Sequence, residues 1–178
     1  MTAPEEQQLD EEVVWQGRFL AAKRKGRWEY VSRTRGVSAA VVLAVDAGQV
    51  ILVEQFRVPL GAMSLELPAG LIGDDTPGEE AEAAAMRELE EETGYRAARM
   101  VRLGRFHASP GMSSEGFTLL RAEGLAKVGQ GGGVDGEDIR VHRVALEDLP
   151  GFIATKRAEG CAMDAKLLLL LGQAFIRT

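Results

Sequence analysis

The side chains best suited to chemistry are acidic residues near the end of one predicted helix, residues 76–93. On such a helix Glu88 and Glu92 lie one turn apart on the same stripe, with Glu91 beside them. Like charges at this spacing repel each other by roughly a few tenths of a kcal/mol, and by more when they are partly buried. A divalent cation would offset the repulsion, and carboxylate oxygens without a nearby histidine or cysteine favour Mg²⁺ or Mn²⁺. The alternative is a solvated surface helix whose acids cluster by chance.

The other residues of the same stripe help to decide between a metal site and a solvated surface helix. Its first turns carry the small apolar residues Ala81, Ala84 and Ala85, whereas a merely solvated helix would hold its acids on the face opposite to its apolar residues. Arg87 can pair with Glu91 one turn later, or reach back toward Glu79, and would then orient the acidic cluster. The pattern therefore favours a metal site.

Short strands and two main helices must hold these acids in place. Thr76, Pro77 and Glu79 form a capping-box pattern that predicts the start of the acidic helix, and Gly94 predicts its end. Asp164–Ile176 is the second predicted helix. Apolar and alternating runs predict strands at residues 13–20, 28–33, 37–45, 49–55, 65–67, 101–108, 116–121 and 138–145.

Two connecting segments have distinctive compositions. Residues 23–26 are basic and end in glycine, which predicts a turn between the first two strands. Residues 129–133 contain four glycines, which predicts a mobile loop. The succession of strands with two main helices predicts an α+β fold.

The bulk properties bound the class of protein. The 178 residues suit one domain with at most a small appendage. A formal charge of −6 argues against a general nucleic-acid-binding surface. Cys161 is the only cysteine, so the chain can form neither an internal disulfide nor a cysteine-based zinc site. No apolar run approaches the ~20 residues of a membrane helix, and the acidic start is unlike a signal peptide, which predicts a cytoplasmic protein.

The acidic helix and its flanks match the motif G-x5-E-x7-R-E-U-x-E-E-x-G-U, in which U is a bulky apolar residue. All fixed positions are filled, by Gly73, Glu79, Arg87, Glu88, Leu89, Glu91, Glu92, Gly94 and Tyr95. The chain therefore resembles the nudix hydrolase superfamily, which this motif defines. In the ADP-ribose branch the motif glycine normally belongs to a Pro-Ala-Gly turn, which stands here at residues 68–70. An insertion in residues 71–76 would make Gly70 the equivalent residue, so both Gly70 and Gly73 are candidates.

The resemblance covers roughly residues 13–175 and points to ADP-ribose pyrophosphatases. Residues 55–59 and 65–70 resemble the strand and turn before the motif in that branch, and residues 109–115 resemble its S-P-G-x-[ST]-x-E loop. Pro110 stands 16 residues after Gly94, where the branch has a marker proline.

The resemblance implies the domain organisation as well. It implies a nudix fold over residues 36–178, in which a mixed β-sheet is sandwiched between helices. An N-terminal antiparallel appendage, residues 13–35, would precede this domain and could be exchanged between the subunits of a homodimer. Residues 1–12 are expected to be a disordered lead.

The matching residues take on metal-binding roles by the same resemblance. Glu88 and Glu92 would be the principal ligands of two or three Mg²⁺ ions, and Mn²⁺ is an alternative. The backbone carbonyl of Ala69 would be a third ligand, with Glu91 close by. Arg87 would orient the cluster.

Residues 135–141 resemble the acidic loop and strand that supply a late catalytic carboxylate. Glu137 would be either a further metal ligand or the base that activates water. Asp135 is the alternative base.

The substrate would be held by residues on other elements. Arg33 and Arg57 would bind the diphosphate, and Glu115 would lie near the terminal ribose. Phe19 and Trp28 occupy positions at which relatives stack aromatic rings on adenine; for Trp28 a core position is the alternative.

The resemblance implies hydrolysis of ADP-ribose to AMP and ribose 5-phosphate. GDP-mannose or another nucleoside diphosphate sugar is the alternative substrate, because the motif reads only the diphosphate and its metals. A nucleotide-sensing module without catalysis is less expected, since such modules typically lose one of the motif acids and all are present here. The expected partners are a nucleotide sugar and a second copy of the chain, with no nucleic acid and no membrane.

Overall fold

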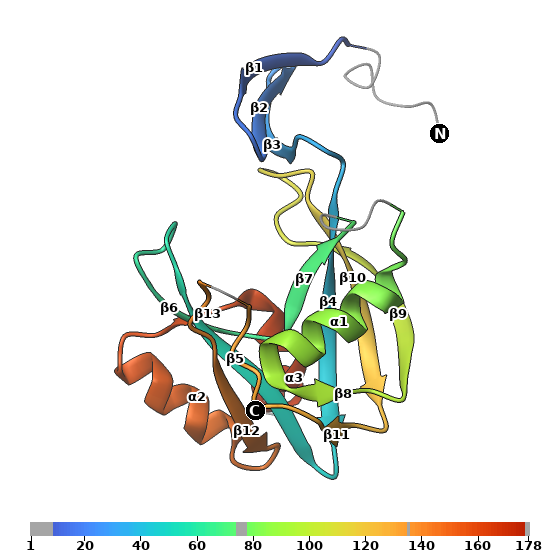
Figure 1. The fold of residues 1–178 in the computed structure, drawn as a ribbon. Helices are drawn as coiled ribbons and strands as arrows, with labels where there is room; N and C mark the ends of the chain where they lie inside the picture. The colour runs from blue at the N-terminus through green and yellow to red at the C-terminus, as the bar shows by residue number, and fades with distance from the viewer. Residues whose placement is uncertain (1–8, 74–77, 135, 177–178) are drawn as a thin grey trace.

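A small antiparallel sheet forms the N-terminal end of the fold. The computed structural model describes residues 9–73, 78–134 and 136–176. Strands β1 (Glu12–Gln16), β2 (Leu20–Lys25) and β3 (Trp28–Arg33) pair in the order β1-β2-β3. Figure 1 shows this sheet standing apart at one end of the molecule, where β3 touches the 109–115 loop through a hydrogen bond from Val31 N to Met112 O of 2.9 Å.

The boundaries within this sheet differ from the prediction. The single strand predicted at 13–20 is wrong, because Gly17 N donates to Leu20 O at 2.8 Å and closes a turn between two strands. The predicted basic turn at 23–26 is also wrong. Lys23 and Arg24 lie within β2, where they pair with Glu11 just before β1 and with Glu12 at its first residue, and the turn begins only at Gly26, which has a φ of 59°. Cross-strand charge pairing explains the basic residues better than a turn does.

The main sheet is mixed and has eight strands. Its path runs β13-β6-β5-β4-β10-β9, with β12 paired to β5 and β7 paired to β4. Strand β10 is parallel to β4 and antiparallel to β9. The strands are β4 (Ser38–Asp46), β5 (Gln49–Arg57), β6 (Ala62–Glu66), β7 (Ala69–Ile72), β9 (Arg99–His107), β10 (Gly116–Glu123), β12 (Arg140–Ala145) and β13 (Ala162–Met163). The short strands β8 (Tyr95–Arg96) and β11 (Ala126–Lys127) form a separate pair.

The central strands are covered on both faces by helices. On β4, Val41 packs into one apolar cluster with Leu149 and Ile153, whereas Val42 packs into a second cluster with Leu89. Successive residues of a strand point to opposite faces, so α1 covers one face while α2 and α3 cover the other. The three helices are α1 (Ala81–Thr93), α2 (Leu149–Ala158) and α3 (Leu168–Ile176). This layering confirms the predicted α+β class with a mixed sheet between helices.

The acidic helix α1 starts later than predicted. It begins at Ala81, with Glu80 as its N-cap in an extended conformation, while Thr76 and Pro77 lie outside the described residues. Glu79 is not a capping partner, because its carboxylate accepts from Gly73 N at 3.4 Å and from Arg87 Nε at 3.3 Å. The predicted end is confirmed, since Gly94 takes the left-handed conformation with a φ of 69°.

A buried carboxylate ties the sheet to α2. Glu54 of β5 is 3% exposed. It accepts a hydrogen bond of 2.7 Å from His142 Nε2 and forms an ion pair of 2.9 Å with Lys156 Nζ. Burial would raise the pKa of Glu54, but the bonds from Lys156 and His142 outweigh burial and lower it. His142 is thus a structural residue that joins β12 to β5.

Across residues 9–73, 78–134 and 136–176, no helix is both long enough and apolar enough to span a bilayer.

Candidate active site

A cleft of about 890 Å³ lies between α1, β7 and the β5–β6 hairpin and collects most of the charged residues singled out above. Its described lining includes seven carboxylates and four basic side chains. The acids are Glu66, Glu88, Glu91, Glu92, Glu115, Glu137 and Asp164, and the bases are Arg33, Arg57, Arg87 and Lys166. The cleft therefore carries a formal excess of three negative charges.

The backbone of β7 lies directly against the acidic stripe of α1. A Cβ on Gly70 would lie 1.9 Å from Glu88 Cδ, so only glycine lets the strand approach this closely. Gly73 serves a different purpose, since it turns the chain with a φ of 77°. The close approach favours Gly70 as the equivalent of the motif glycine, with Gly73 matching by spacing.

Glu92 is the most buried acid of the cleft. It is 5% exposed, and its Oε2 accepts a hydrogen bond of 3.1 Å from Ala69 N, the first residue of β7. Burial raises the pKa of Glu92 to about 8, the nearby charges of Glu88 and Glu137 add to the rise, and the bond from Ala69 opposes it. The charge of Arg57 also opposes the rise, but burial dominates, so the site holds a carboxylate that is costly to ionise.

Arg87 holds the other acids of the helix together. Its guanidinium lies 3.3 Å from Glu79 Oε1, 2.9 Å from Glu88 Oε1 and 3.1 Å from Glu91 Oε2. The bond to Glu79, above all, raises the pKa of Arg87 above its ordinary value. Burial raises the pKa of Glu88 despite the opposing charge of Arg87. Arg87 thus orients the cluster from its edge, as its spacing from Glu91 predicted.

Glu137 reaches the same cleft from the segment before β12. Its Oε2 accepts a hydrogen bond of 3.0 Å from Val134 N, and its charge raises the pKa of both Glu88 and Glu92. The alternative base, Asp135, lies outside the described residues.

The chemistry of these acidic residues suits a divalent metal ion. All are carboxylates, with the backbone of Ala69 at hand, which is the donor set of a hard divalent cation. Within the part of the chain that the structure describes, no three acidic, imidazole or thiol groups already converge enough to hold an ion. Glu88, Glu92 and Glu137 instead turn to protein donors, namely Arg87, Ala69 N and Val134 N. The residues fit such an ion once these side chains rotate toward one another.

Arg57 is positioned by a residue that the sequence analysis did not assign. Its Nε and Nη2 each donate to one oxygen of Glu66 at 2.8 Å, a bidentate pair. Glu66 is 5% exposed at the end of β6. The pair fixes the guanidinium at the wall of the cleft, and Glu66 raises the pKa of Arg57. A charged residue inside the apolar run Leu65–Leu67 was the available signal, because such a residue needs a partner when it is buried.

Arg33 and Glu115 were predicted to bind different parts of a substrate, yet they form a pair. Arg33 of β3 lies 2.5 Å from Glu115 Oε1 through Nη2 and donates to the same oxygen through Nε at 2.7 Å. Both line the cleft. The N-terminal sheet therefore reaches the site of its own chain through Arg33.

Three of the predicted substrate-binding residues do not line the cleft of their own chain: Phe19, Trp28 and Pro110. Phe19 is 57% exposed and Trp28 is 46% exposed, so the core alternative for Trp28 is wrong. Trp28 is the first residue of β3 and Phe19 lies in the turn between β1 and β2, so both residues belong to the separate N-terminal sheet.

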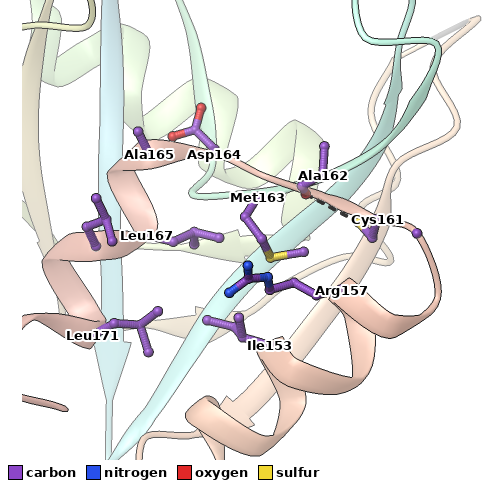
Figure 2. A pocket seen from close by; sticks show the side chains of 11 residues that line it. Ile153, Arg157, Cys161, Ala162, Met163, Asp164, Ala165, Leu167 and Leu171 are labelled. Atoms are coloured by element: carbon purple, nitrogen blue, oxygen red, sulfur yellow. Dashed lines mark hydrogen bonds between the residues drawn. The ribbon is translucent and has the colours of Figure 1, made fainter. Parts of the chain in front are cut away.

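The C-terminal segment supplies two residues that no sequence pattern indicated. Asp164 accepts hydrogen bonds from Lys166 N at 2.7 Å and from Lys166 Nζ at 2.6 Å, and both side chains line the cleft. On the other side of this segment is a second cavity of about 500 Å³, between α2 and α3. Figure 2 shows Asp164 pointing away from that cavity, which Ile153 and Leu171 help to line.

The second cavity offers little for catalysis. Its cysteine, Cys161, is half-buried, and burial raises the pKa of the thiol, so that the unreactive protonated form is favoured. Apart from Arg157 and Asp164 its described lining is apolar or small. The chemistry therefore belongs to the larger cleft.

Comparisons with known proteins agree with this assignment. Residues 34–161 match the model of the NUDIX domain. The chain is 39% identical over 112 residues to an ADP-ribose pyrophosphatase of Bacillus subtilis (strain 168), covering 62% of this chain and 59% of that protein. It is 34% identical over 152 residues to a GDP-mannose pyrophosphatase of Cronobacter sakazakii, covering 80% and 75%.

A solved structure shares the fold. The crystal structure of an ADP compounds hydrolase superposes with a TM-score of 0.68 at 22% identity, over 93% of this chain and 91% of that one. Matches to the B. subtilis protein and two further relatives span 59%, 64% and 58% of those proteins' lengths.

The buried carboxylate leads to a prediction for the metal-free protein. The pKa of Glu92 is raised from 4.5 to about 8, so the stability that protonated Glu92 contributes is complete below about pH 4.5 and is lost as the pH rises through about 8. We expect Glu92→Gln, which cannot ionise, to melt at a higher temperature than the parent protein at pH 9 and at a similar temperature at pH 5. Thermal melts in EDTA from pH 5 to 9 measure this.

The control for this experiment is Glu90→Gln. The bond from Arg96 lowers the pKa of exposed Glu90, so this variant should gain no stability at high pH. Melting curves of Glu92→Gln that run parallel to those of the parent at all pH values would contradict the prediction.

Proposed function

The chain belongs to the NUDIX domain family, and we propose that it hydrolyses the diphosphate bridge of a nucleoside diphosphate linked to a sugar. One observation carries the proposal: the cleft presents an excess of carboxylates, and all four of its basic side chains are already paired with acids. A diphosphate anion would be repelled by such a cleft unless divalent cations bound with it.

The metal requirement follows from the same surplus of negative charge. We propose that Glu88 and Glu92 are the principal ligands, with the Ala69 carbonyl and Glu91 as further ligands, for two or three Mg²⁺ ions. Bound ions of this kind neutralise phosphate oxygens and lower the pKa of a coordinated water. The elevated pKa of Glu92 supports the assignment, since a nearby cation would stabilise the ionised carboxylate.

The other residues divide the work of orientation and proton transfer. Arg57, held by Glu66, binds a phosphate oxygen at the wall of the cleft. Glu137 takes the proton of the attacking water, whose oxygen forms a bond to one phosphorus as the bridging P–O bond breaks. Arg87 keeps Glu88 and Glu91 oriented. The leaving phosphate departs with the bridging oxygen.

ADP-ribose is the substrate that we propose, with AMP and ribose 5-phosphate as products. The 109–115 loop supports this choice, because it carries Pro110 and places Glu115 at the cleft. The relative from B. subtilis bears the name ADP-ribose pyrophosphatase. The relative from C. sakazakii, a GDP-mannose pyrophosphatase, aligns over a larger share of the chain, so GDP-mannose remains the second candidate.

We propose that the N-terminal sheet, residues 13–35, is exchanged between the subunits of a homodimer. The aromatic rings of Phe19 and Trp28 are exposed and lie outside the cleft of their own chain. Valine and tryptophan side chains of β1 are exposed as well: Val13, Val14 and Trp15. A second copy would cover this apolar surface and receive the rings beside its bound base.

The first test is AMP release from ADP-ribose in Mg²⁺ and in EDTA. We expect release only with Mg²⁺, and we expect Glu92→Gln to lower kcat by roughly two to four orders of magnitude because it removes a ligand charge at the reacting phosphates. Glu90→Gln, on the same helix but paired with Arg96 outside the cleft, should retain the parent activity. Undiminished turnover by Glu92→Gln would refute the metal assignment.

The second test separates the candidate substrates. We expect kcat/KM to be highest for ADP-ribose in a panel that also contains GDP-mannose and ADP-glucose, because the loop residues would contact the second ribose. A higher kcat/KM for GDP-mannose would replace ADP-ribose as the substrate while leaving the chemistry of the cleft unchanged.

The third test concerns Trp28 and the second copy. Trp28→Ala should raise KM for ADP-ribose roughly fivefold or more, since stacking on a base is worth about 1–3 kcal/mol. Trp15→Ala, in the neighbouring strand β1, is the control and should have a smaller effect.

Mixing a variant that lacks the Trp28 ring with a variant that lacks turnover tests whether the ring of one subunit serves the metal site of the other. Mixed dimers of Trp28→Ala with Glu92→Gln should regain the parent KM, because the intact ring of one subunit would serve the intact metal site of the other. No recovery after subunit exchange would show that Trp28 does not act across a dimer.

A further inference from the structure

The glycine-rich segment 128–133 is attached to the end of α1 by its backbone. Gly132 N donates to Glu92 O at 2.8 Å, and Gly133 N donates to Glu91 O at 3.0 Å. Val128 N and Gly129 N both donate to Gly94 O, at 2.9 and 3.1 Å. These are carbonyls that a helix end leaves without an internal partner, so the segment satisfies them in place of water. Such bonding does not fit the mobile loop that the glycine content predicted.

A lysine next to the segment supplies the positive charge that the helix end lacks. The last turn of α1 contains no basic residue. Lys127 Nζ donates to Thr93 O at 2.8 Å and to Gln130 O at 3.2 Å, and it lies 4.6 Å from the centre of the Tyr95 ring. A cation is favourable at the C-terminus of a helix, so this lysine strengthens the attachment.

The glycines permit a contact between backbones that no other residue would allow. A Cβ on Gly131 would lie 2.4 Å from the carbonyl carbon of Thr93 and 2.7 Å from Gly94 N. A Cβ on Gly94 would lie 2.3 Å from Gly129 O. Two stretches of main chain thus touch face to face, and a single added methyl group would force them apart.

The contact bears on the acids of the cleft because Glu137 lies just beyond the segment. A Cβ on Gly133 would lie 2.4 Å from Glu137 Oε2, so the carboxylate rests on the backbone of a residue that is itself bonded to Glu91. The chain is also fixed on the C-terminal side of Glu137. Ile139 is 6% exposed, and Arg140 begins the pairing of β12 with β5.

We propose that the 128–133 segment fixes Glu137 relative to Glu88 and Glu92, and that Gly131 is a positioning residue for the reaction. The inference rests on the proposed function in treating Glu137 as the base. The segment bonds to the main chain of the same helical turn that carries the acids, so the base and the metal ligands share one rigid support. Preorganised catalytic groups lose activity when they are displaced by as little as about 1 Å.

The test compares two glycines of matched conformation. Gly131 and Gly48 have φ values of 73° and 75°, but a Cβ on Gly48 would meet no atom within 4 Å. Alanine is therefore strained to a similar degree at both positions, and only Gly131→Ala also separates the segment from α1. We expect Gly131→Ala to lower kcat roughly 10- to 100-fold, with KM and the Mg²⁺ midpoint unchanged, and Gly48→Ala to keep the parent kcat.

A double-mutant cycle distinguishes positioning of the base from general loss of structure. We expect Gly131→Ala to have no further effect on kcat in a Glu137→Gln background, since the group that it displaces is already absent. An equal loss of kcat in both backgrounds would overturn the positioning role, and so would a parent-like kcat in Gly131→Ala.

Hydrogen exchange tests the attachment without any assay of activity. The amides of Gly132 and Gly133 should exchange slowly in the parent and in Gly48→Ala, and faster in Gly131→Ala. Equal exchange in all three proteins would overturn the attachment itself. If the parent cleaves no nucleotide sugar while the exchange result holds, the proposed function fails and takes the catalytic part of the inference with it, while the attachment stands.

Discussion

Glu92 is a carboxylate that the fold has removed from water without fully compensating for the lost hydration. Its backbone bond from Ala69 N offsets only part of the cost, because burial and the charges of Glu88 and Glu137 raise its pKa to about 8. A group held in this way is costly to ionise until a cation arrives. The surrounding architecture has the effect of keeping these acids together: Gly70 lets β7 lie against Glu88, and Arg87 restrains the outer acids without neutralising the inner one.

The basic residues of the cleft obey the same constraint. Arg57 is held by Glu66 and Lys166 by Asp164, so each of these two cations is oriented by an acid outside α1, whereas Arg87 pairs with Glu88 and Glu91 of the helix itself. Fixed pairs of this kind hold a guanidinium or an ammonium at one place, which costs little reorganisation when an anion binds. They also leave the cleft negative overall, so the diphosphate recognition that we propose would depend on divalent cations as much as on arginine.

How far the sequence could predict this site depends on the range of each interaction. The acidic stripe, the end of α1 at Gly94 and the cleft positions of Glu88 and Glu92 followed from local spacing and from the motif, whereas those of Glu137 and Arg57 followed only from the resemblance beyond the motif. The start of α1 could not be predicted, because Glu79 bonds to Arg87 and Gly73 instead of capping the helix. Pairs such as Arg33 with Glu115 join residues 82 positions apart, and no local pattern contains them.

The same distinction explains why chemistry was easier to infer than specificity. The acids that we propose as the principal metal ligands, Glu88 and Glu92, lie about one helical turn apart and are therefore visible as spacing. A base and a second sugar would lie at the ends of the cleft, near Arg33 and the 109–115 loop, where the N-terminal sheet meets the main domain. That junction combines separate elements, and exposed rings such as Trp28 lie outside the cleft of their own chain. Relatives named as pyrophosphatases of ADP-ribose and of GDP-mannose both resemble this chain, and we propose that substrate choice is made where the chain and its second copy close over the two ends of the ligand.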